Sequence, residues 1–445
     1  MTPAAHPSSG ETVADRAATV HTPRLLARVL RDRPLSLAEH HAVHGPLPGV
    51  ARGWTGTASR GQSRVLLHEI QTAGIGGRGG AGFPFARKLA AVAAQRRRPV
   101  VVVNAAESEP AAHKDATLAT LTPHLVLDGA AVSARLLGAR EIVVWTHRGE
   151  TAVARSLRAA VRERDDRGLQ WKVVDGPDRY VAGESSAIVR HLSGGPAKPS
   201  TTPPRVAERG VGGAPTLLSN AETFAHVALV VRHGAPWFRS LGTVDEPGTL
   251  LLTLAGAAER PGVVEVPFGA RLGAVVETFG GLAEPVDAVL VGGYGGRWLT
   301  WAAAATLPVT RQAFRSAGAD LGVGVIGLLP RRRCGLAETA RLTRWMAEQS
   351  AGQCGPCVNG LPAMAGAFES LVHSGNAQTP TLLRRWARQV TGRGACHHPD
   401  GVAHLVDSAL DVFTEAIDRH LLDGVCVGCA EPPVLPLPRS QGGWR

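Results

Sequence analysis

Three short apolar runs, separated by segments of helical periodicity, constrain the fold of this chain most strongly. Residues 100–103 are four consecutive valines, and two mostly apolar runs, each with one charged residue, follow at 141–145 and 171–174. A strand that is apolar at every position is buried on both faces, as the strands of parallel sheets are. Helical segments lie between the runs, so the pattern predicts a mostly parallel α/β sheet with helices on its faces.

The pattern changes twice further along the chain. After Pro247 it predicts short strands at 250–254, 263–266 and 288–291 around one helix near 272–279, and from Cys334 it is helical again. The 445 residues suffice for about three domains. We expect a poorly ordered arm (1–50) with one short helix near 25–30, an α/β domain (51–247), a β-rich module (248–330), a helical bundle (331–422) and a flexible tail containing a C-x-x-C pair (423–445).

The charge balance does not predict a nucleic-acid partner, although the formal net charge is +11. The basic runs at 96–98 and 331–333 lack the interleaved aromatic residues of a single-strand binding groove, and we interpret them as solvated faces. The chain has no apolar run near the ~20 residues of a membrane helix and no secretory signal. The sequence therefore predicts a cytoplasmic protein without direct membrane insertion.

A glycine-rich loop is expected at 74–84, with the sequence GIGGRGGAGFP. It contains the G-x-G-x-x-G spacing twice, but it follows a predicted helix, whereas the dinucleotide fingerprint follows a strand. Clustered glycines allow backbone N–H groups to converge at the start of the next helix, which is a binding site for an anion. A flexible surface loop is the alternative.

Polar residues follow the valine run directly, in the segment 104–110. Ligands of α/β sheets collect at the carboxyl ends of strands, so this segment is expected to face the glycine-rich loop. A solvated turn explains the same residues equally well. Two further polar segments, 178–184 and 218–223, are not diagnostic alone.

The cysteines indicate a metal centre. Five of the six lie in the last quarter of the chain, as the pair Cys354 and Cys357, the single Cys396, and the pair Cys426 and Cys429. Such C-x-x-C pairs with a distant cysteine are typical of iron–sulfur ligation. Zinc is the competing interpretation, but the two pairs lie further apart than the ~15–20 residues usual in a zinc ribbon. Cys334 is interpreted as a small buried hydrophobic residue.

Five segments, taken in order, resemble the FMN-binding, NADH-oxidising subunits of bacterial NADH:quinone oxidoreductases and of NAD-linked hydrogenases and formate dehydrogenases. They are GRGGAGFP (77–84), NAAESEP (104–110), RYVAGE (179–184), SNAET (219–223) and GQCGPCVNG (352–360). The resemblance covers about residues 64–422. It implies a flavin-binding α/β domain, a ubiquitin-like β-grasp module and a helical bundle with a 4Fe–4S cluster.

The same resemblance implies site residues. The expected FMN contacts are Gly77, Arg78, Gly79, Gly80, Lys88, Asn104, Glu107, Tyr180, Gly183, Glu184, Ser219, Asn220 and Thr223. Phe83 and Glu109 match positions that contact the nicotinamide dinucleotide, and Glu109 is our candidate catalytic residue. The expected cluster ligands are Cys354, Cys357 and Cys396.

Several positions differ from the family pattern: Ala106 and Ser185 replace carboxylates, Thr202 a lysine, Arg205 an aromatic residue and Ala351 a ligand cysteine. A 3Fe–4S cluster, or a 4Fe–4S cluster completed by His397, Cys334, Cys426 or Cys429, is therefore expected.

Three functions remain open at this stage. The first is an NAD(P)H:acceptor oxidoreductase that works with a ferredoxin-like or thioredoxin-like iron–sulfur subunit. The second is an electron conduit or assembly subunit that no longer binds dinucleotide, and the third is a structural relative with zinc or nothing at its cysteines.

Overall fold

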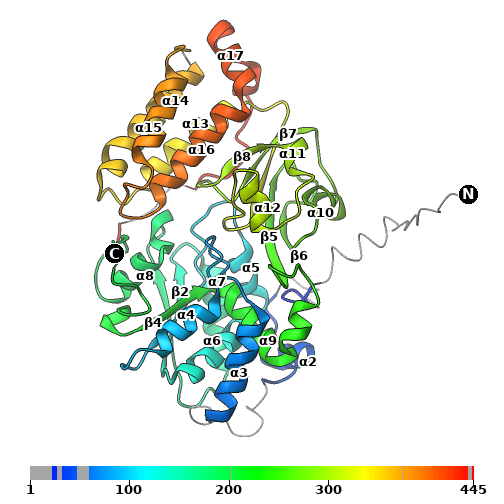
Figure 1. Ribbon diagram of the computed structural model, residues 1–445, viewed down its shortest axis with the longest axis vertical. Helices are drawn as coiled ribbons and strands as arrows, with labels where there is room; N and C mark the ends of the chain where they lie inside the picture. The colour runs from blue at the N-terminus through cyan, green and yellow to red at the C-terminus, as the bar shows by residue number, and fades with distance from the viewer. Residues whose placement is uncertain (1–22, 28–32, 48–59, 202, 374, 439–442) are drawn as a thin grey trace, which may run out of the picture.

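The computed structural model describes residues 23–27, 33–47, 60–201, 203–373, 375–438 and 443–445. Figure 1 shows an α/β body at the bottom, a second sheet with short helices above and beside it, and a group of long helices at the top. Among the described helices, none is long and apolar enough to cross a membrane.

The α/β body is built on a parallel sheet in the order β3-β2-β1-β4. Its strands are β1 (Val100–Asn104), β2 (Glu141–His147), β3 (Gln170–Gly176) and β4 (Thr216–Asn220). The predicted parallel arrangement of the first three is confirmed, and β1 is buried along its whole length. β4 has no counterpart among the predicted strands, because its apolar stretch is only Leu217 and Leu218. Its register places Asn220 beside Asn104, so the polar ends of β1 and β4 meet at one edge.

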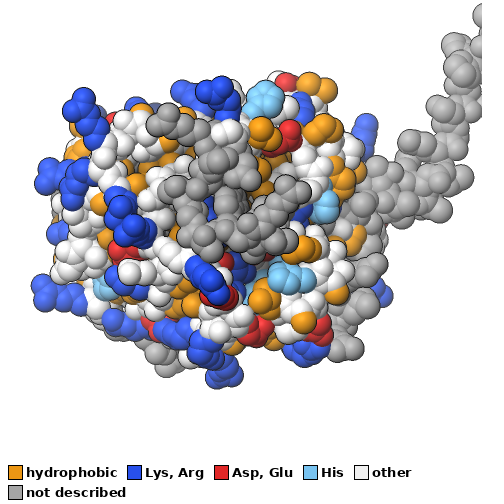
Figure 2. Space-filling view, turned by 90° about the horizontal axis from the view of Figure 1, so that it is seen from below, with side chains coloured by type: hydrophobic (Ala, Val, Ile, Leu, Met, Phe, Trp, Pro, Cys, Tyr) orange, Lys and Arg blue, Asp and Glu red, His pale blue; other side chains and the backbone are white. Residues whose placement is uncertain are grey.

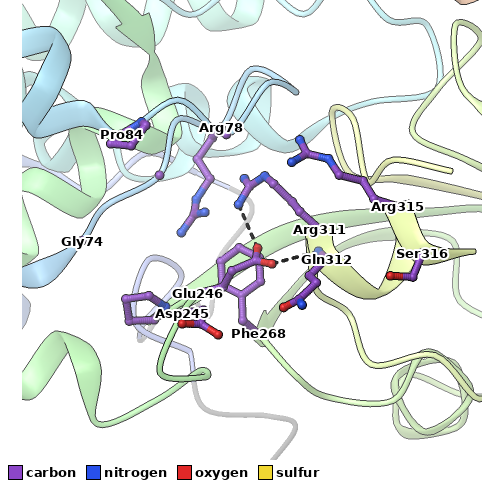
Figure 3. A pocket seen from close by; sticks show the side chains of 13 residues that line it. Gly74, Arg78, Pro84, Asp245, Glu246, Phe268, Arg311, Gln312, Arg315 and Ser316 are labelled. Carbon is purple, nitrogen blue, oxygen red and sulfur yellow. Dashed lines mark hydrogen bonds and ion pairs between the residues drawn. The ribbon is translucent and has the colours of Figure 1, made fainter. Parts of the chain in front are cut away.

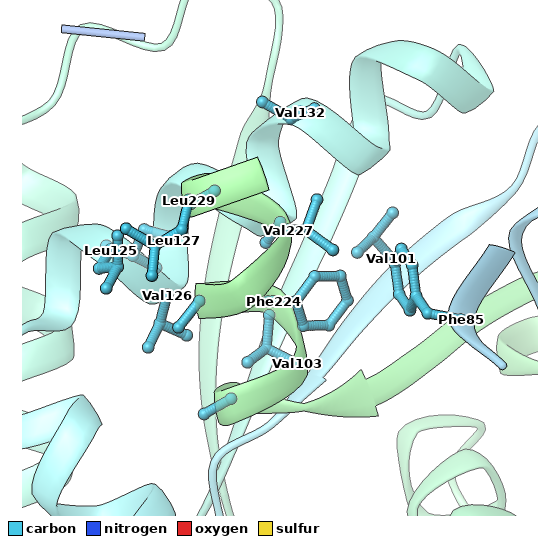
Figure 4. Packing of buried hydrophobic residues seen from close by; sticks show 14 of the residues in the cluster. Phe85, Val101, Val103, Leu125, Val126, Leu127, Val132, Phe224, Val227 and Leu229 are labelled. Atoms are coloured by element: carbon cyan, nitrogen blue, oxygen red, sulfur yellow. The ribbon is translucent and has the colours of Figure 1, made fainter. Parts of the chain in front are cut away.

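Helices cover this sheet and form its core. They are α3 (Arg60–Ala73), α4 (Phe85–Ala93), α5 (Lys114–Leu121), α6 (Pro123–Leu137), α7 (Thr151–Glu163), α8 (Ser185–Leu192) and α9 (Ala221–Arg239). Figure 4 shows Phe224 of α9 next to Phe85 of α4 and the β1 side chains Val101 and Val103. The two rings meet edge to face with centroids 5.8 Å apart. The apolar face of α4 thus fixes where the preceding glycine-rich loop ends.

The described parts of the N-terminal arm are packed, which differs from the expectation of poor order. Leu25 is fully buried, and its backbone N–H donates to the carboxylate of Glu265 at 2.9 Å. Helix α2 (Leu37–His44) begins with a capping box between Ser36 and Glu39. Residues 1–22, 28–32 and 48–50 of the arm, and with them most of the helix expected near 25–30, lie outside the described residues.

The second sheet is mixed, in the order β6-β5-β9-β7-β8. Its strands are β5 (Thr249–Gly256), β6 (Gly262–Pro267), β7 (Val286–Val291), β8 (Arg297–Thr300) and β9 (Val325–Pro330), with the short helices α10 (Leu272–Thr278), α11 (Trp301–Ala304) and α12 (Arg311–Ser316). Strands β5 and β9 are parallel, and the other pairs are antiparallel.

The chain then forms α13 (Gly335–Glu348), α14 (Leu361–His373), α15 (Thr379–Val390), α16 (His398–Val412) and α17 (Thr414–Asp423). Apolar residues recur at spacings of three and four through 402–421, but they belong to two helices, because Phe413 departs from helical geometry. The segment after α17 is not the expected free tail in its described part. Leu435 is 2% exposed, and the indole N–H of Trp345 donates to the carbonyl of Pro438 at 2.9 Å.

The surplus of positive charge is dispersed on the face that Figure 2 shows. Lys and Arg side chains (blue) occur around the whole outline, separated by uncharged atoms. On this face the charge is therefore not concentrated at one place.

The contact between α6 and α9 yields a stability prediction. A Cβ on Gly129 would lie 1.8 Å from the carbonyl oxygen of Phe224, and backbone cannot move aside cheaply. We expect Gly129→Ala to lower the free energy of unfolding by at least about 1–3 kcal/mol. The matched control is Gly61→Ala on α3, whose Cβ would meet nothing within 4 Å. Equal thermal unfolding of the two variants by calorimetry would contradict the packing.

Candidate functional site

The glycine-rich loop is closed at its base and leans on the end of β4. The N–H of Gly77 donates to the carbonyl of Phe83 at 2.9 Å, and that of Phe85 to Ile75 at 2.9 Å. A Cβ on Gly79 would lie 2.5 Å from Oδ1 of Asn220. Gly80 has a φ of 102°, in the region that favours glycine. The loop therefore needs these glycines to approach the carboxyl edge of the sheet.

Arg78 anchors the loop from below through a buried charge network. Its backbone N–H donates to Oγ1 of Thr223 at 3.1 Å, and its guanidinium donates to the carbonyl of Thr249 at 2.8 Å. The guanidinium also lies 3.3 Å from Glu222, which is 3.1 Å from the ammonium of Lys114. Burial alone would raise the pKa of Glu222, but Lys114, His226 and Arg78 hold it at about 2. Arg78 thus ties the loop to α9 and to the second sheet.

Lys88 supplies a positive charge beneath the loop. Its ammonium is partly buried and donates to the carbonyl of Leu218 in β4 at 2.8 Å. Burial lowers its pKa. Within the described ranges no carboxylate pairs with it, so its charge is available to an anion at the edge of the sheet.

Hydrogen bonds to nearby backbone groups hold the predicted polar side chains in place at the carboxyl end of β1. The side-chain amide of Asn104 donates to the carbonyl of Gly183 at 3.1 Å. Glu107 accepts from the N–H groups of Asp115 and Ala116 at the start of α5, and Glu184 accepts similarly at the start of α8. Burial, together with the charge of Asp115, raises the pKa of Glu107 to about 8. The predicted site segments therefore converge here.

Glu109 lies where the three parts of the molecule meet. Its Oε2 accepts from the hydroxyl of Tyr180 at 3.2 Å and from the N–H of Tyr294 at 2.9 Å, while its buried Oε1 has no hydrogen-bond partner in the described structure. Burial raises its pKa to about 7, although hydrogen bonds with Tyr294, Tyr180 and the backbone of Ala111 oppose the rise. The Tyr180 ring is 5.5 Å from that of His398. A buried carboxyl group with a free oxygen is suited to holding a proton near neutral pH.

The remaining predicted residues occupy different depths. Ser219 and Thr223 are buried. Phe83, at the outer end of the glycine-rich loop, is 46% exposed, and the Arg87 guanidinium lies 5.5 Å from its ring centre. Arg205 is exposed, and Thr202 lies outside the described residues.

A cavity of about 580 Å³ lies beside the loop, toward the second sheet (Figure 3). Arg311 reaches from α12 across it, donating to the carbonyl of Gly77 at 3.1 Å and pairing with Glu246 at 3.1 Å. Phe268 lies beneath the guanidinium groups of Arg78 and Arg311. Of the predicted site residues only Arg78 lines this cavity, so it is distinct from the edge formed by Asn104 and Asn220.

The three predicted cluster cysteines lie at the end of the helical group that contacts the α/β body. Cys357 is buried in a turn of π-helix, Pro356–Gly360. Burial raises its pKa to about 12, and the neighbouring thiols of Cys354 and Cys396 add to the rise. At the position of the missing cysteine, the Ala351 carbonyl accepts from Lys198 at 2.8 Å. Burial raises the pKa of Cys396, and the charge of Glu184, at the carboxyl edge of the sheet, adds to the rise.

Of the fourth-ligand candidates, only His397 is close to these cysteines, as the residue after Cys396. The His397 side chain is fully exposed and is paired with Asp400 at 3.0 Å. Cys334, Cys426 and Cys429 gather with His420 at the opposite end of α13, whose 14 residues span about 20 Å. The expectation that one of these three completes the cluster is therefore wrong. Cys334 packs in the apolar core as expected, but its thiol also faces His420 at 3.5 Å.

Comparisons with known proteins agree with this layout. Residues 70–229 match the family described as the Nuo51 FMN-binding domain, and residues 337–420 match the iron–sulfur binding region of NADH-ubiquinone oxidoreductase-F. Over these two regions the chain is similar to the flavin subunits of such oxidoreductases. The resemblance of the five sequence segments is thereby confirmed.

Relatives cover both regions and the part between them. The F-type NADH-quinone oxidoreductase subunit of Salmonella typhimurium is 29% identical over 429 residues, covering 89% of this chain and 94% of the relative. The Streptomyces coelicolor protein of the same name is 28% identical, covering 81% and 84%. The solved NAD+-reducing NiFe hydrogenase in its H2-reduced state has a TM-score of 0.76 and 28% identity over 81% of this chain. The match spans 63% of that hydrogenase chain, less than two thirds of its length.

Sequence reasoning missed the parts of this flavin-subunit site that come from distant segments. Tyr294 contacts Glu109 through its backbone, which no side-chain pattern reveals. His420 is one of 17 histidines in the chain. The sequence distinguishes it from the others only by its position near the end of α17, shortly before Cys426 and Cys429. The sequence did offer one indication. Tyr180, one of only two tyrosines in the chain, is the residue that contacts Glu109 where the three parts of the molecule meet.

The raised pKa of Glu109 predicts a pH dependence of stability. A carboxyl whose folded-state pKa is above its unfolded value stabilises the fold at low pH, and that contribution is lost as pH rises from about 4.3 through about 7. We expect Glu109→Gln, which keeps an acceptor for Tyr180 and Tyr294, to remove up to about 3 kcal/mol of this loss. Thermal unfolding from pH 5 to pH 8 measures it.

The matched control for that variant is Glu259→Gln, at an exposed position. It should follow the wild-type pH profile. If Glu109→Gln also follows the wild-type profile, Glu109 is ionised throughout and the argument for a proton at Oε1 fails.

Proposed function

We propose that this protein transfers electrons from a reduced nicotinamide nucleotide, through FMN, to an iron–sulfur cluster and on to an acceptor protein. One observation carries the proposal. The guanidinium of Arg190, on the helix α8 that begins at the edge expected to hold flavin, donates at 3.0 Å to the side chain of Gln353, which precedes the cluster cysteine Cys354. The Tyr180 ring, from the same edge, also packs on His398 in the cluster region. The two expected cofactor sites are therefore neighbours.

The residues present fit FMN at the edge of the sheet. The glycine-rich loop gives close approach to backbone, and Lys88 has a charge with no carboxylate partner in the described structure. Asn104, Ser219 and Asn220 line the ends of β1 and β4. Bound FMN would accept a hydride and release electrons singly. The chain would neutralise the phosphate with Lys88 and hold a proton at Oε1 of Glu109.

The dinucleotide is expected between the half-exposed ring of Phe83 and the buried carboxyl group of Glu109. Two carboxylates of the family pattern are absent here, at Ala106 and Ser185, which reduces repulsion toward an additional phosphate. NADPH is therefore a candidate donor beside NADH. Exposed Arg205 can stack on adenine through its guanidinium plane. The second candidate function, an electron conduit without nucleotide, is favoured by the absence of an aromatic residue at position 205.

Further parts of the proposal concern architecture and partners. The strand order β6-β5-β9-β7-β8 supports a β-grasp module within residues 248–330, and helices α13 to α17 support an iron–sulfur bundle within 331–422. The names of the relatives support work within a multi-subunit oxidoreductase. We propose a ferredoxin-like or thioredoxin-like iron–sulfur subunit as the partner, and a cytoplasmic location.

Stopped-flow bleaching of the flavin tests the proposal. NADH or NADPH added anaerobically to the FMN-loaded protein should bleach the flavin. Gly79→Ala should weaken FMN binding about tenfold, equivalent to about 1.4 kcal/mol, because the new Cβ displaces the Asn220 amide. Gly61→Ala serves as the control. Bleaching by neither nucleotide would favour the conduit, and a chain that takes up no FMN would overturn both.

The cluster gives a separate prediction at Ala351. With three cysteines, the wild-type cluster is expected to be 3Fe–4S or a 4Fe–4S cluster that loses one iron readily. Ala351→Cys should yield a stable 4Fe–4S cluster, seen as loss of the oxidised 3Fe–4S paramagnetic signal and a gain of iron per chain. Cys354→Ser should remove iron and sulfide together. Unchanged iron in Cys354→Ser would count against the ligand assignment.

A further inference from the structure

Four metal-binding side chains converge at the far end of the helices, away from the flavin edge and the predicted cluster. They are Cys334, His420, Cys426 and Cys429, whose ligand atoms all lie within 4.8 Å of one another. Cys334 precedes α13, His420 is near the end of α17, and the cysteine pair occupies the turn that follows. In Figure 1 this end of α17 is at the top, remote from α8.

The spacing of the ligand atoms fits one tetrahedral ion. With Zn–S near 2.3 Å and Zn–N near 2.05 Å, a tetrahedron places sulfur atoms about 3.8 Å apart and sulfur and nitrogen about 3.6 Å apart. The observed Sγ–Sγ distance between Cys426 and Cys429 is 3.6 Å. Nε2 of His420 lies 3.5 Å from Sγ of Cys334 and 3.8 Å from Sγ of Cys429. The set Cys3His is one that structural zinc sites use.

The imidazole is already oriented as a ligand. Nδ1 of His420 lies 2.9 Å from the carbonyl of Val372, which accepts only from a protonated nitrogen. The proton is thus fixed on Nδ1, and the lone pair of Nε2 points at the three sulfur atoms. Metal-bound histidines are usually held in this way by a second hydrogen bond.

Backbone hydrogen bonds also hold Cys334 and the segment with Cys426 and Cys429 in position. Sγ of Cys334 accepts from the N–H of Ala337 at 3.5 Å, as a thiolate does at a helix start. The N–H of Cys334 donates to the carbonyl of Gly428 at 3.3 Å. A Cβ on Gly428 would lie 2.8 Å from the Arg332 carbonyl and 2.9 Å from that N–H nitrogen, so glycine is required between the paired cysteines.

Two other interpretations of these four side chains, a disulfide and a purely apolar role, explain fewer of the observed contacts than a zinc site does. A disulfide between Cys426 and Cys429 would use two sulfur atoms and leave Cys334 and Nε2 of His420 directed at nothing. An apolar role accounts for the burial of Cys334. It does not explain why His420, which is only 2% exposed, directs the lone pair of Nε2 at the Cys334 thiol. The iron–sulfur binding region matched in the family ends at residue 420, before the Cys426 pair.

We propose that Cys334, His420, Cys426 and Cys429 bind one Zn²⁺ ion as a structural site, independent of the flavin and of the iron–sulfur cluster. Zinc replaces the three thiol protons and joins the start of α13 to the segment that follows α17. That segment then runs back along α13, where the N–H of Leu435 donates to Glu338 at 2.9 Å. The ion fixes the start of this return path.

Metal analysis of the full-length protein tests the assignment. We expect one zinc per chain in addition to iron. In Cys426→Ser, zinc binding measured by competition with a chromophoric chelator should weaken by more than the about 10–100-fold typical of an outer-shell change, with iron and FMN retained. The control Val427→Ala alters an 87% exposed side chain in the same turn and should keep its zinc.

Cobalt substitution keeps the proposal testable if Cys426→Ser does not fold. Co²⁺ in the wild-type site should give the absorption of tetrahedral three-sulfur, one-nitrogen coordination, and His420→Cys should shift it toward four sulfurs. The proposal is overturned by wild-type protein that takes up no zinc, by iron in this site instead of zinc, by a Cys426–Cys429 disulfide in reduced preparations, or by a cobalt spectrum that His420→Cys leaves unchanged.

Discussion

The buried carboxyl group of Glu109 is the contact on which the arrangement of the molecule depends. It follows the first strand of the α/β body, and it accepts hydrogen bonds from Tyr180 of the same body and from Tyr294 of the second sheet. The rings of both tyrosines lie 5.7 Å from that of Trp345 on α13. An unpaired buried carboxylate is costly, so the two donors are needed wherever Glu109 is enclosed. The three parts of the chain are thus held at one point, next to the expected hydride-transfer site.

A second buried network sets the position of the glycine-rich loop. Arg78, Lys114, Glu222 and Asp115 are each less than 5% exposed, and the two cations pair with the two carboxylates. Removing one partner from such a network leaves a buried charge without compensation, which costs more than the pair contributes in net stability. The network therefore specifies where the loop lies more than it stabilises the fold. The loop is free to use its backbone for a ligand because its one charged side chain, Arg78, is directed inward.

The sequence predicts local structure well where the physical cause is local. The valine run of β1 and the glycines before α4 are readable because burial on both faces and positive φ each impose a residue type. It fails where the cause is a distant partner. Leu25 is ordered by Glu265, more than 200 residues away, and Cys334 acquires its neighbours only when α17 returns to the start of α13. The expected site residues on the strand ends do converge, because parallel strands share one carboxyl edge, whereas Tyr294 reaches Glu109 from another sheet.

The return of the C-terminal segment has a consequence for how the chain is made. The N–H of Ala197 donates to the carbonyl of Trp444 at 2.7 Å, and the Trp444 ring receives the cations of Lys198 and Arg179. Lys198 also donates to the carbonyl of Ala351, at the expected cluster. The wall beside that cluster is therefore closed by residues that leave the ribosome after the α/β body, the second sheet and helices α13 to α17. Since distant contacts form late in folding, the α/β body can collapse during synthesis, while the cluster pocket stays open until Trp444 has been made.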